Sequence, residues 1–585
     1  MDLKLLRRNA IVGFLVLVLA TELAALTVRH DDLSSYFFAL QDLPVLGLAI
    51  GLIWLLPRLE GLRRHLRPVT AALTARPGLT VALMAAAVAL TGWIGSRVVF
   101  GGQPLSADEG MALFDAQIFR HGALIAPLAP GWRPFDFAMA PTFQIFLKSG
   151  AAWSSSYYPV NAMLHAAMDC VGLRAATGGV LAAASVALIH RLARRLWPET
   201  STAGLVAVLL LASSSQLLVT SMTAYAMSAH LALNLLWLNL FLARGRLSQV
   251  LALATAAAAT GLHQLVFHPL FAAPFVLQLW LDRRLGRAAF HTAGYLALAL
   301  LWPHYWDLAL GSAHLSRAHD AATVLDPAKI AWSQLESLGP HALQWQLENL
   351  CRAVSWQNPL TLALFLVGVP LALRSGGVER SLLAGLVLTL GLVTVIIPYQ
   401  GHGWGYRYLH GLLGNVVLIA VRGASVVWPR EAGPGPGRRA LTVVTASALL
   451  CAAVLVPVRM WQAHGFSAPY VRAEAVITHA PADLVLVSSD GLAFGEDLVR
   501  NDPWLRNRPV VMSVMTLTPG LIERACGLGR VAIFDRTAGG AAGILPQPLA
   551  DADSPAGRRF ARLNQLQAAG RCGPILTRDP GRPAR

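Results

Sequence analysis

The chain has 585 residues, of which 55% are hydrophobic and only 13% are charged. That is more apolar surface than one soluble core can bury, because such cores stop growing at about 250–300 residues, so most of it must face lipid. The formal charge of +16 would indicate nucleic-acid binding in a soluble protein, but the basic residues lie between apolar runs, which argues against a nucleic-acid partner.

The apolar runs predict a polytopic α-helical membrane protein, since helices of about 20 residues cross a hydrocarbon layer of about 30 Å. The first run lacks a cleavage pattern of small residues, so we expect a retained helix. Basic pairs such as Arg7-Arg8 and Arg438-Arg439 fall in every second connection, which predicts that those connections are cytoplasmic. Hydropathy predicts about thirteen spans, near 9–29, 38–57, 79–99, 168–190, 202–221, 226–243, 248–264, 266–281, 289–306, 358–374, 381–398, 409–428 and 440–458.

The chain divides into three predicted parts. Residues 1–78 form a two-span segment, and 79–458 form a transmembrane catalytic domain whose first long outward loop is 100–167. Residues 459–585 contain three apolar runs typical of β-strands, alternating with polar helical stretches, and then a tail rich in Pro, Gly and Arg. We expect a small soluble α/β domain with a disordered end. The apolar runs are Leu484–Val487, Val510–Met512 and Val531–Phe534.

An acidic pair opens the first long loop. Asp108 and Glu109 follow Ser106, and Met111, Phe114 and Ile118 then recur at helical spacing opposite Asp115, Gln117 and Arg120. This predicts an amphipathic helix lying on the membrane. Ser106 and Glu109 match a capping box, which gives Glu109 a structural interpretation. Asp108 has no such explanation; the helix dipole stabilises its negative charge, and a carboxylate there suits proton acceptance.

Other polar residues of the loop are candidates for substrate binding. Arg133, Asp136 and Lys148 lie in a stretch otherwise poor in charge, and Tyr158 belongs to an aromatic entry to the next span. Aromatic residues at a membrane interface are the ordinary explanation for the tyrosines and tryptophans. The three charged residues are less easily explained as anchors, so we expect a role in binding.

The connection 399–410 is the second candidate region. It contains His402, Tyr406, Arg407 and Tyr408 among three glycines. Glycines allow close approach of backbone to a ligand, and the guanidinium of Arg407 offers a fork of donors matched to phosphate. The alternative is an ordinary turn with interfacial aromatics and a snorkelling arginine. An arginine on the outer side runs against the charge bias, which favours binding.

No metal centre is predicted. His263 and His268 are five residues apart, off the spacing of a helical metal pair, and His314, His319 and Asp320 have suitable ligand types without a specific spacing. A divalent metal ion stays open as a cofactor. The five cysteines form no C-x-x-C pair, although two in the C-terminal part could form a disulfide outside the cytoplasm. These two are Cys526 and Cys572.

Taken in order, these motifs resemble the membrane-embedded glycosyltransferases of the GT-C superfamily, in particular the protein O-mannosyltransferase and aminoarabinose-transferase-like group. The resemblance covers roughly 79–428. It departs at Tyr158-Pro159-Val160-Asn161, where many relatives have Tyr-Pro-Pro-Gly. The motifs that carry it are Ser106-x-Asp108-Glu109-Gly110, Phe114-x-x-x-Ile118-Phe119-x-x-Gly122, Tyr157-Tyr158-Pro159 and Gly405-Tyr406-Arg407-Tyr408.

The resemblance implies an inverting glycosyltransferase of the bacterial inner membrane with its site on the periplasmic side. Its donor would be a sugar on a polyprenyl phosphate, and its acceptor a hydroxyl of a lipid, glycan or protein. Asp108 would take the acceptor's proton, with Glu109 capping the helix or orienting Asp108. Arg407, helped by Arg133 or Lys148, would stabilise the departing phosphate, while Tyr406 and Tyr408 would line the site.

Two other functions stay open from the sequence. A lipid or glycan transporter or flippase also has many spans, but it places ionisable residues at mid-membrane depth, whereas Glu22 and Asp169 lie near span ends here. A non-catalytic partner in a glycan-assembly complex is the third possibility. It becomes preferred if Asp108 is dispensable.

Overall fold

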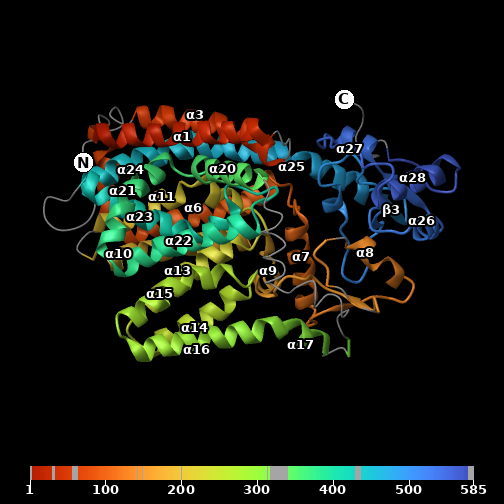
Figure 1. Ribbon diagram of the computed structural model, residues 1–585, viewed down its shortest axis with the longest axis horizontal. Helices are drawn as coiled ribbons and strands as arrows, with labels where there is room; N and C mark the ends of the chain where they lie inside the picture. Colours follow the sequence, from red (N-terminus) through yellow and green to blue (C-terminus); the bar gives the residue numbers. More distant parts are fainter. Residues whose placement is uncertain are drawn as a thin grey trace. The chain divides into compact units, whose positions relative to one another are not determined.

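The computed structural model describes residues 3–28, 33–55, 63–140, 142–145, 147, 149–198, 201–311, 314–315, 340–428 and 437–576. Figure 1 shows a chain that is mostly helical. It divides into two compact units. The helical unit contains Met1–Gly95, Ala175–Pro303 and Leu325–Gln462, and the mixed unit contains Ser96–Arg174, His304–Val324 and Ala463–Arg585.

The helical unit is built almost entirely from apolar helices around one large core of Leu, Ile, Val, Ala and aromatic side chains. Within it, α14, α15 and α16 pack on one another, and α10 packs against both α11 and α13. Its helices are α1 (Leu3–Val28), α2 (Leu33–Phe37), α3 (Leu43–Trp54), α5 (Arg63–Ala75), α6 (Pro77–Val98), α10 (Thr177–Leu196), α11 (Ser201–Ala212), α12 (Ser215–Thr220), α13 (Met227–Phe241), α14 (Arg246–Thr260), α15 (Phe267–Leu281), α16 (Leu285–Leu301), α20 (Pro340–Ser355), α21 (Pro359–Ser375), α22 (Gly377–Ile396), α23 (Leu413–Val427) and α24 (Arg438–Leu450).

Short irregular helices join these elements. They include the π-helices η1 (Phe38–Asp42) and η6 (Cys451–Leu455), and the 3-10 helices η3 (Arg174–Ala176), η4 (Trp302–His304) and η5 (Arg407–Leu412). The long helix α25 (Val456–Thr478) follows η6 and continues some way beyond the predicted end of the last span at residue 458. The chain therefore stays helical into the mixed unit.

Among the described residues, six helices are long and apolar enough to cross a membrane, or up to seven if a pair bent by 110° at residues 356–358 counts as one span. The six are Leu33–Trp54, Pro77–Val98, Arg174–Leu196, Gly377–Ile396, Arg407–Val427 and Arg438–Thr478. Each matches a predicted span, so a multi-span helical protein is confirmed. The predicted count of about thirteen spans is not confirmed, because other predicted spans correspond to shorter helices. The expected span 202–221, for example, is interrupted where α11 ends at Ala212.

The mixed unit joins the first loop to the C-terminal part of the chain. A parallel sheet of order β4-β3-β5 pairs Leu484 with Val510 and with Val531, and the strands fall on the three predicted apolar runs. Every strand residue is buried, as in parallel sheets covered on both faces. Its elements are α7 (Ala107–Arg120), β1 (Ala126–Pro127), η2 (Arg133–Phe135), α8 (Asp136–Met139), β2 (Ala152–Trp153), α9 (Val160–Cys170), α17 (Tyr305–Gly311), β3 (Leu484–Val487), η7 (Gly495–Leu498), β4 (Val510–Ser513), α26 (Pro519–Cys526), β5 (Val531–Phe534), α27 (Arg536–Ala542) and α28 (Pro555–Ala568).

One hydrophobic core spans both sequence segments of the mixed unit. Met111, Phe114 and Ile118 of α7 belong to the same cluster as Leu486 and Met512 of the sheet. The expectation that the apolar face of α7 lies on the membrane is therefore wrong: protein side chains of its own unit cover it. A disulfide between Cys526 and Cys572 links the end of α26 to the segment after α28.

Candidate active site

The helix α7 begins as the sequence predicts. Ser106 is its N-cap and accepts a hydrogen bond from the backbone N–H of Glu109 at 3.2 Å, and the Glu109 carboxylate accepts from the N–H of Leu105 at 3.0 Å and of Ser106 at 3.3 Å. This is a capping box. Glu109 is 2% exposed, so its observed role is to start the helix.

Asp108 is partly exposed at the first turn of α7. The hydroxyl of Tyr157 donates a hydrogen bond to its carboxylate. Another acid, Asp497, accepts from the N–H of Ala107 at 3.0 Å and thereby satisfies a helix-terminal amide. The sequence names Tyr158 as a candidate for substrate binding, and its neighbour Tyr157 is the residue whose hydroxyl contacts Asp108.

Segment 152–158 follows the face of α7 that carries Asp108 and Asp115, two helical turns apart. Asp115 accepts from the hydroxyl of Ser154 at 3.1 Å and from the N–H of Ser155 at 3.0 Å. Burial raises the pKa of Asp115 to about 7, and the two serine hydrogen bonds offset this in part. The prediction that Asp115 belongs to the polar outer face of α7 is wrong, since its side chain is 2% exposed.

The other candidates of the first loop lie apart from the capping box in the sequence. Arg133 is exposed and donates from Nε to the carbonyl of Leu128 at 3.3 Å. Asp136 is buried and accepts from the N–H of Phe137 at 2.7 Å, and burial raises its pKa. Tyr158 is partly buried. Lys148 lies outside the described residues, as do His319 and Asp320.

The glycine-rich connection before η5 is shaped by two glutamines. Gln400 accepts from the N–H of Arg407 at 3.1 Å and donates to the carbonyl of Gly405 at 3.1 Å. Gln216 donates to the carbonyl of Tyr406 at 2.9 Å. Gly405 has a φ of +70°, and a Cβ there would meet the Gln216 side chain at 2.5 Å. This glycine therefore admits a close approach of the protein's own interior, where the sequence predicts an approach to a ligand.

Arg407 lies over two aromatic rings. Its guanidinium carbon is 5.6 Å from the centroid of Tyr225 and 5.1 Å from that of Tyr408, and its Nη2 donates to the Tyr408 hydroxyl at 3.3 Å. The buried His402 meets the Tyr225 hydroxyl at 3.2 Å through Nδ1. Two of the predicted residues, Arg407 and His402, thus meet at Tyr225, whose ring stabilises the cation.

Tyr406 contacts a different residue from Arg407 and Tyr408. It is fully buried and donates its hydroxyl to Gln346 at 3.0 Å. Arg407 and Tyr408 also line a cavity of about 20 Å³ with His230, His263 and Thr389, a space that suits one or two water molecules. His230 is buried and its two ring nitrogens have no hydrogen-bond partner among the described residues.

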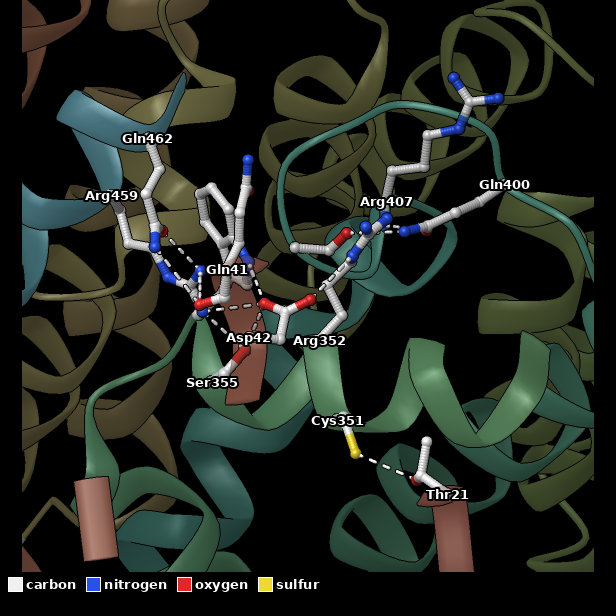
Figure 2. Close-up of polar contacts among 12 residues, drawn as sticks. Thr21, Gln41, Asp42, Cys351, Arg352, Ser355, Gln400, Arg407, Arg459 and Gln462 are labelled. Carbon is white, nitrogen blue, oxygen red and sulfur yellow. Dashed lines mark hydrogen bonds and ion pairs between the residues drawn. The ribbon is translucent and has the colours of Figure 1, made fainter. Parts of the chain in front are cut away.

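A buried charge cluster of the helical unit was not predicted (Figure 2). The Asp42 carboxylate accepts from Arg459 Nη2 at 2.9 Å, Arg352 Nε at 3.3 Å, the Ser355 hydroxyl at 2.8 Å and the Trp356 indole at 3.0 Å. Asp42, Arg352 and Arg459 are 1%, 3% and 0% exposed. An acid inside the predicted span 38–57 was the available signal, because such a residue needs a counter-charge.

No group of three or more His, Cys, Asp or Glu side chains in the described ranges is placed to hold a metal ion. The chain matches no protein-family model and no curated protein.

The solved structures that are similar to this chain include the following two. Both are of ArnT from Cupriavidus metallidurans. The apo form has a TM-score of 0.45 and 12% identity over 72% of this chain and 84% of that one. The form bound to undecaprenyl phosphate has a TM-score of 0.44 and 12% identity over 84% of this chain and 89% of that one. At this level of likeness, function must be argued from the site itself.

Proposed function

We propose that the protein is an inverting glycosyltransferase that moves a sugar from a polyprenyl-phosphate donor to a hydroxyl of a lipid, glycan or protein. The observation that carries this proposal is Asp108, a partly exposed carboxylate at a helix N-terminus whose position is fixed by the Tyr157 hydroxyl. A general base must be oriented and reachable at once. The order of motifs along 100–408, which resembles the GT-C superfamily, supports the choice of reaction.

The proposed step is a single displacement. The acceptor oxygen attacks the anomeric carbon while the bond from that carbon to the phosphate oxygen breaks. The acceptor's proton passes to Asp108, which becomes a carboxylic acid, and the bonding electrons leave with the polyprenyl phosphate. Attack opposite to the leaving group inverts the anomeric configuration.

Arg407 is proposed to stabilise the departing phosphate. Its guanidinium lies over the rings of Tyr225 and Tyr408, and these contacts orient it. A positioned cation that is ready for developing negative charge costs no reorganisation during the reaction. His402 contacts the hydroxyl of Tyr225 through Nδ1 and so helps to hold that ring in place. Arg133 and Lys148 are proposed as further phosphate contacts.

The proposed location is the inner membrane of a bacterium, with about thirteen spans and the first loop and C-terminal α/β region on the periplasmic side. The basic residues in alternate connections support this orientation. The disulfide between Cys526 and Cys572 supports it independently, because disulfides persist in oxidising compartments.

One observation bears on the transporter alternative. Asp42 is an acid inside a predicted span, where ionisable residues commonly mark a substrate path. Its carboxylate, however, accepts from four donors of the protein itself. A carboxylate so completely engaged ties helices together, so the cluster favours a structural role over transport.

The test is release of polyprenyl phosphate by the purified protein. Undecaprenyl-phosphate sugars labelled in the sugar are supplied in detergent with a lipid extract as acceptor. We expect release by the wild type, loss in Asp108→Asn and Arg407→Ala, and an unchanged rate in Asp553→Asn, an exposed aspartate of the mixed unit. The product's anomeric configuration should be opposite to the donor's. Absence of release with every donor, or retention of configuration, contradicts the proposal.

A further inference from the structure

The mixed unit contains a cavity of about 320 Å³ on a second face of α7. Ala107, Gly110, Met111 and Phe114 supply one wall, and residues 496–502 and 507–511 supply another. The volume lies at the lower end of the range for small-molecule sites. Nothing in the proposed chemistry of Asp108 uses this space, although the first turn of the helix borders it.

The charged side chains around the cavity nearly balance. Three arginines face four carboxylates: Arg174, Arg500 and Arg508 against Glu474, Glu496, Asp497 and Asp502. Two of the carboxylates already pair with arginines: Glu474 with Arg500, and Asp502 with Arg506 outside the cavity. A phosphate would meet a surplus of carboxylates, and a polyamine would meet three guanidinium groups. The balance therefore disfavours a strongly charged ligand of either sign.

The wall chemistry suits a neutral molecule with many hydroxyls. Glu496 has a buried carboxyl group whose pKa is raised, chiefly by burial, and its oxygens can accept hydrogen bonds from hydroxyls. Gln103, Gln117 and Thr478 add groups that donate as well as accept hydrogen bonds, while Met111 and Phe114 offer an apolar floor. Alternating hydroxyls and C–H faces are the pattern of a carbohydrate.

The lining is held in place by the protein. Asn501 donates to the carbonyls of Met139 and Val511, both at 2.8 Å, and accepts from the Val511 N–H at 2.9 Å. Asn507 donates to Asn501 Oδ1 at 3.0 Å. These bonds fix segments 496–502 and 507–511 to each other and to Met139, so this wall is preformed and a ligand bears little ordering cost against it.

We infer that this cavity binds a neutral saccharide portion of the acceptor, remote from the reacting hydroxyl. The inference rests on the proposed function, because it is the shared first turn of α7 that relates the cavity to Asp108. Binding energy from such a remote part of a substrate serves to position the reacting group. The acceptor would accordingly be a glycan or glycolipid carrying uncharged sugars.

The experiment is saccharide binding to the full-length protein in detergent. Fluorescently labelled malto-, cello- and mannotriose are titrated separately, with inorganic phosphate and spermidine as charged probes. The blocking variant is Gly110→Leu: a Cβ at Gly110 meets nothing within 4 Å, leucine is a better helix former, and its side chain would fill the cavity. The matched control is Gly520→Leu, an exposed helical glycine of the same unit that also has open space around a Cβ.

We expect at least one neutral trisaccharide to bind, with affinity at least tenfold weaker in Gly110→Leu and unchanged in Gly520→Leu and Asp108→Asn. The inference is overturned if no trisaccharide binds, if Gly110→Leu binds as the wild type does, or if phosphate or spermidine is the probe that Gly110→Leu excludes. The Asp108→Asn variant separates the two proposals. The proposed function predicts that this variant loses glycosyl transfer, and the cavity proposal predicts that it still binds saccharide.

Discussion

Asp42 of the helical unit and Asp108 of the mixed unit are both held by hydrogen bonds, but their surroundings differ. Asp42 is 1% exposed and accepts from two guanidiniums, a hydroxyl and an indole. Asp108 is partly exposed at a helix terminus, where a tyrosine hydroxyl orients it. A carboxylate enclosed by donors stabilises a fold, whereas one that is oriented yet reachable can exchange a proton with a substrate.

The largest expected effect is on stability, from Asp42→Asn. The change leaves two buried arginines without their counter-charge, which typically costs about 3–5 kcal/mol. We expect a sharply lower apparent unfolding temperature and a poor yield of monodisperse protein in size-exclusion chromatography. Asp169→Asn is the control, because Asp169 pairs with an exposed arginine and such pairs contribute about 0–1 kcal/mol. An Asp42→Asn protein that folds normally but has lost activity would show that Asp42 has a functional role, and would contradict the contrast drawn between Asp42 and Asp108.

The next effect depends on pH and concerns Asp115. Its pKa is raised by burial to about 7 in the fold, so the folded state holds a proton that the unfolded chain releases. Stability should therefore fall as pH rises from about 4 to about 7, by on the order of a few kcal/mol. Asp115→Asn keeps an oxygen acceptor for Ser154 and Ser155 and should abolish the slope. The measurement is the apparent unfolding temperature of both proteins across this pH interval. Equal slopes of unfolding temperature against pH would contradict the burial of Asp115.

Tyr157→Phe should affect turnover more than stability. It removes the hydroxyl that orients Asp108, and a hydrogen bond to a charged group contributes about 1.5–3 kcal/mol, or roughly 10–100-fold in rate. Tyr158→Phe is the matched control at the neighbouring position and should keep the wild-type rate. Initial rates of polyprenyl-phosphate release make the test. A larger loss in Tyr158→Phe would favour the residue chosen from the sequence.

The smallest effect is expected from Glu109→Gln. A glutamine can complete a capping box as a glutamate does, so unfolding should change by less than about 1 kcal/mol and turnover should persist. Loss of turnover in a stable Glu109→Gln protein would restore Glu109 as a catalytic carboxylate. Rate and unfolding temperature are measured on the same preparation.

Much of the local structure could be predicted from the sequence because local chemistry determines it. The capping box at Ser106, the strand at Leu484–Val487 and six of the apolar spans each depend on neighbours in the chain. The burial of Met111 and Phe114 in the core of the mixed unit could not be predicted in this way, since an apolar helix face looks the same whether it meets lipid or protein. The lengths of the shorter apolar helices in the helical unit, such as α11 and α13, could likewise not be predicted from hydropathy.

The site shows the same limit. Asp108 and the segment around Arg407 stand out by residue type and position, but each also contacts residues of distant segments. Tyr157 lies 49 residues from Asp108, and Gln216 lies 190 residues from Tyr406. No spacing in the sequence encodes such contacts. Asp42 was overlooked because its countercharges, Arg352 and Arg459, are 310 and 417 residues away.

The most direct test of the account is the single-turnover rate of Asp108→Asn at saturating donor, measured together with donor affinity. A general base contributes about 10²–10⁴-fold to a rate. We expect a loss of that size in Asp108→Asn, with donor affinity and unfolding temperature at their wild-type values. An Asp108→Asn protein that transfers sugar at the wild-type rate would contradict the central claim.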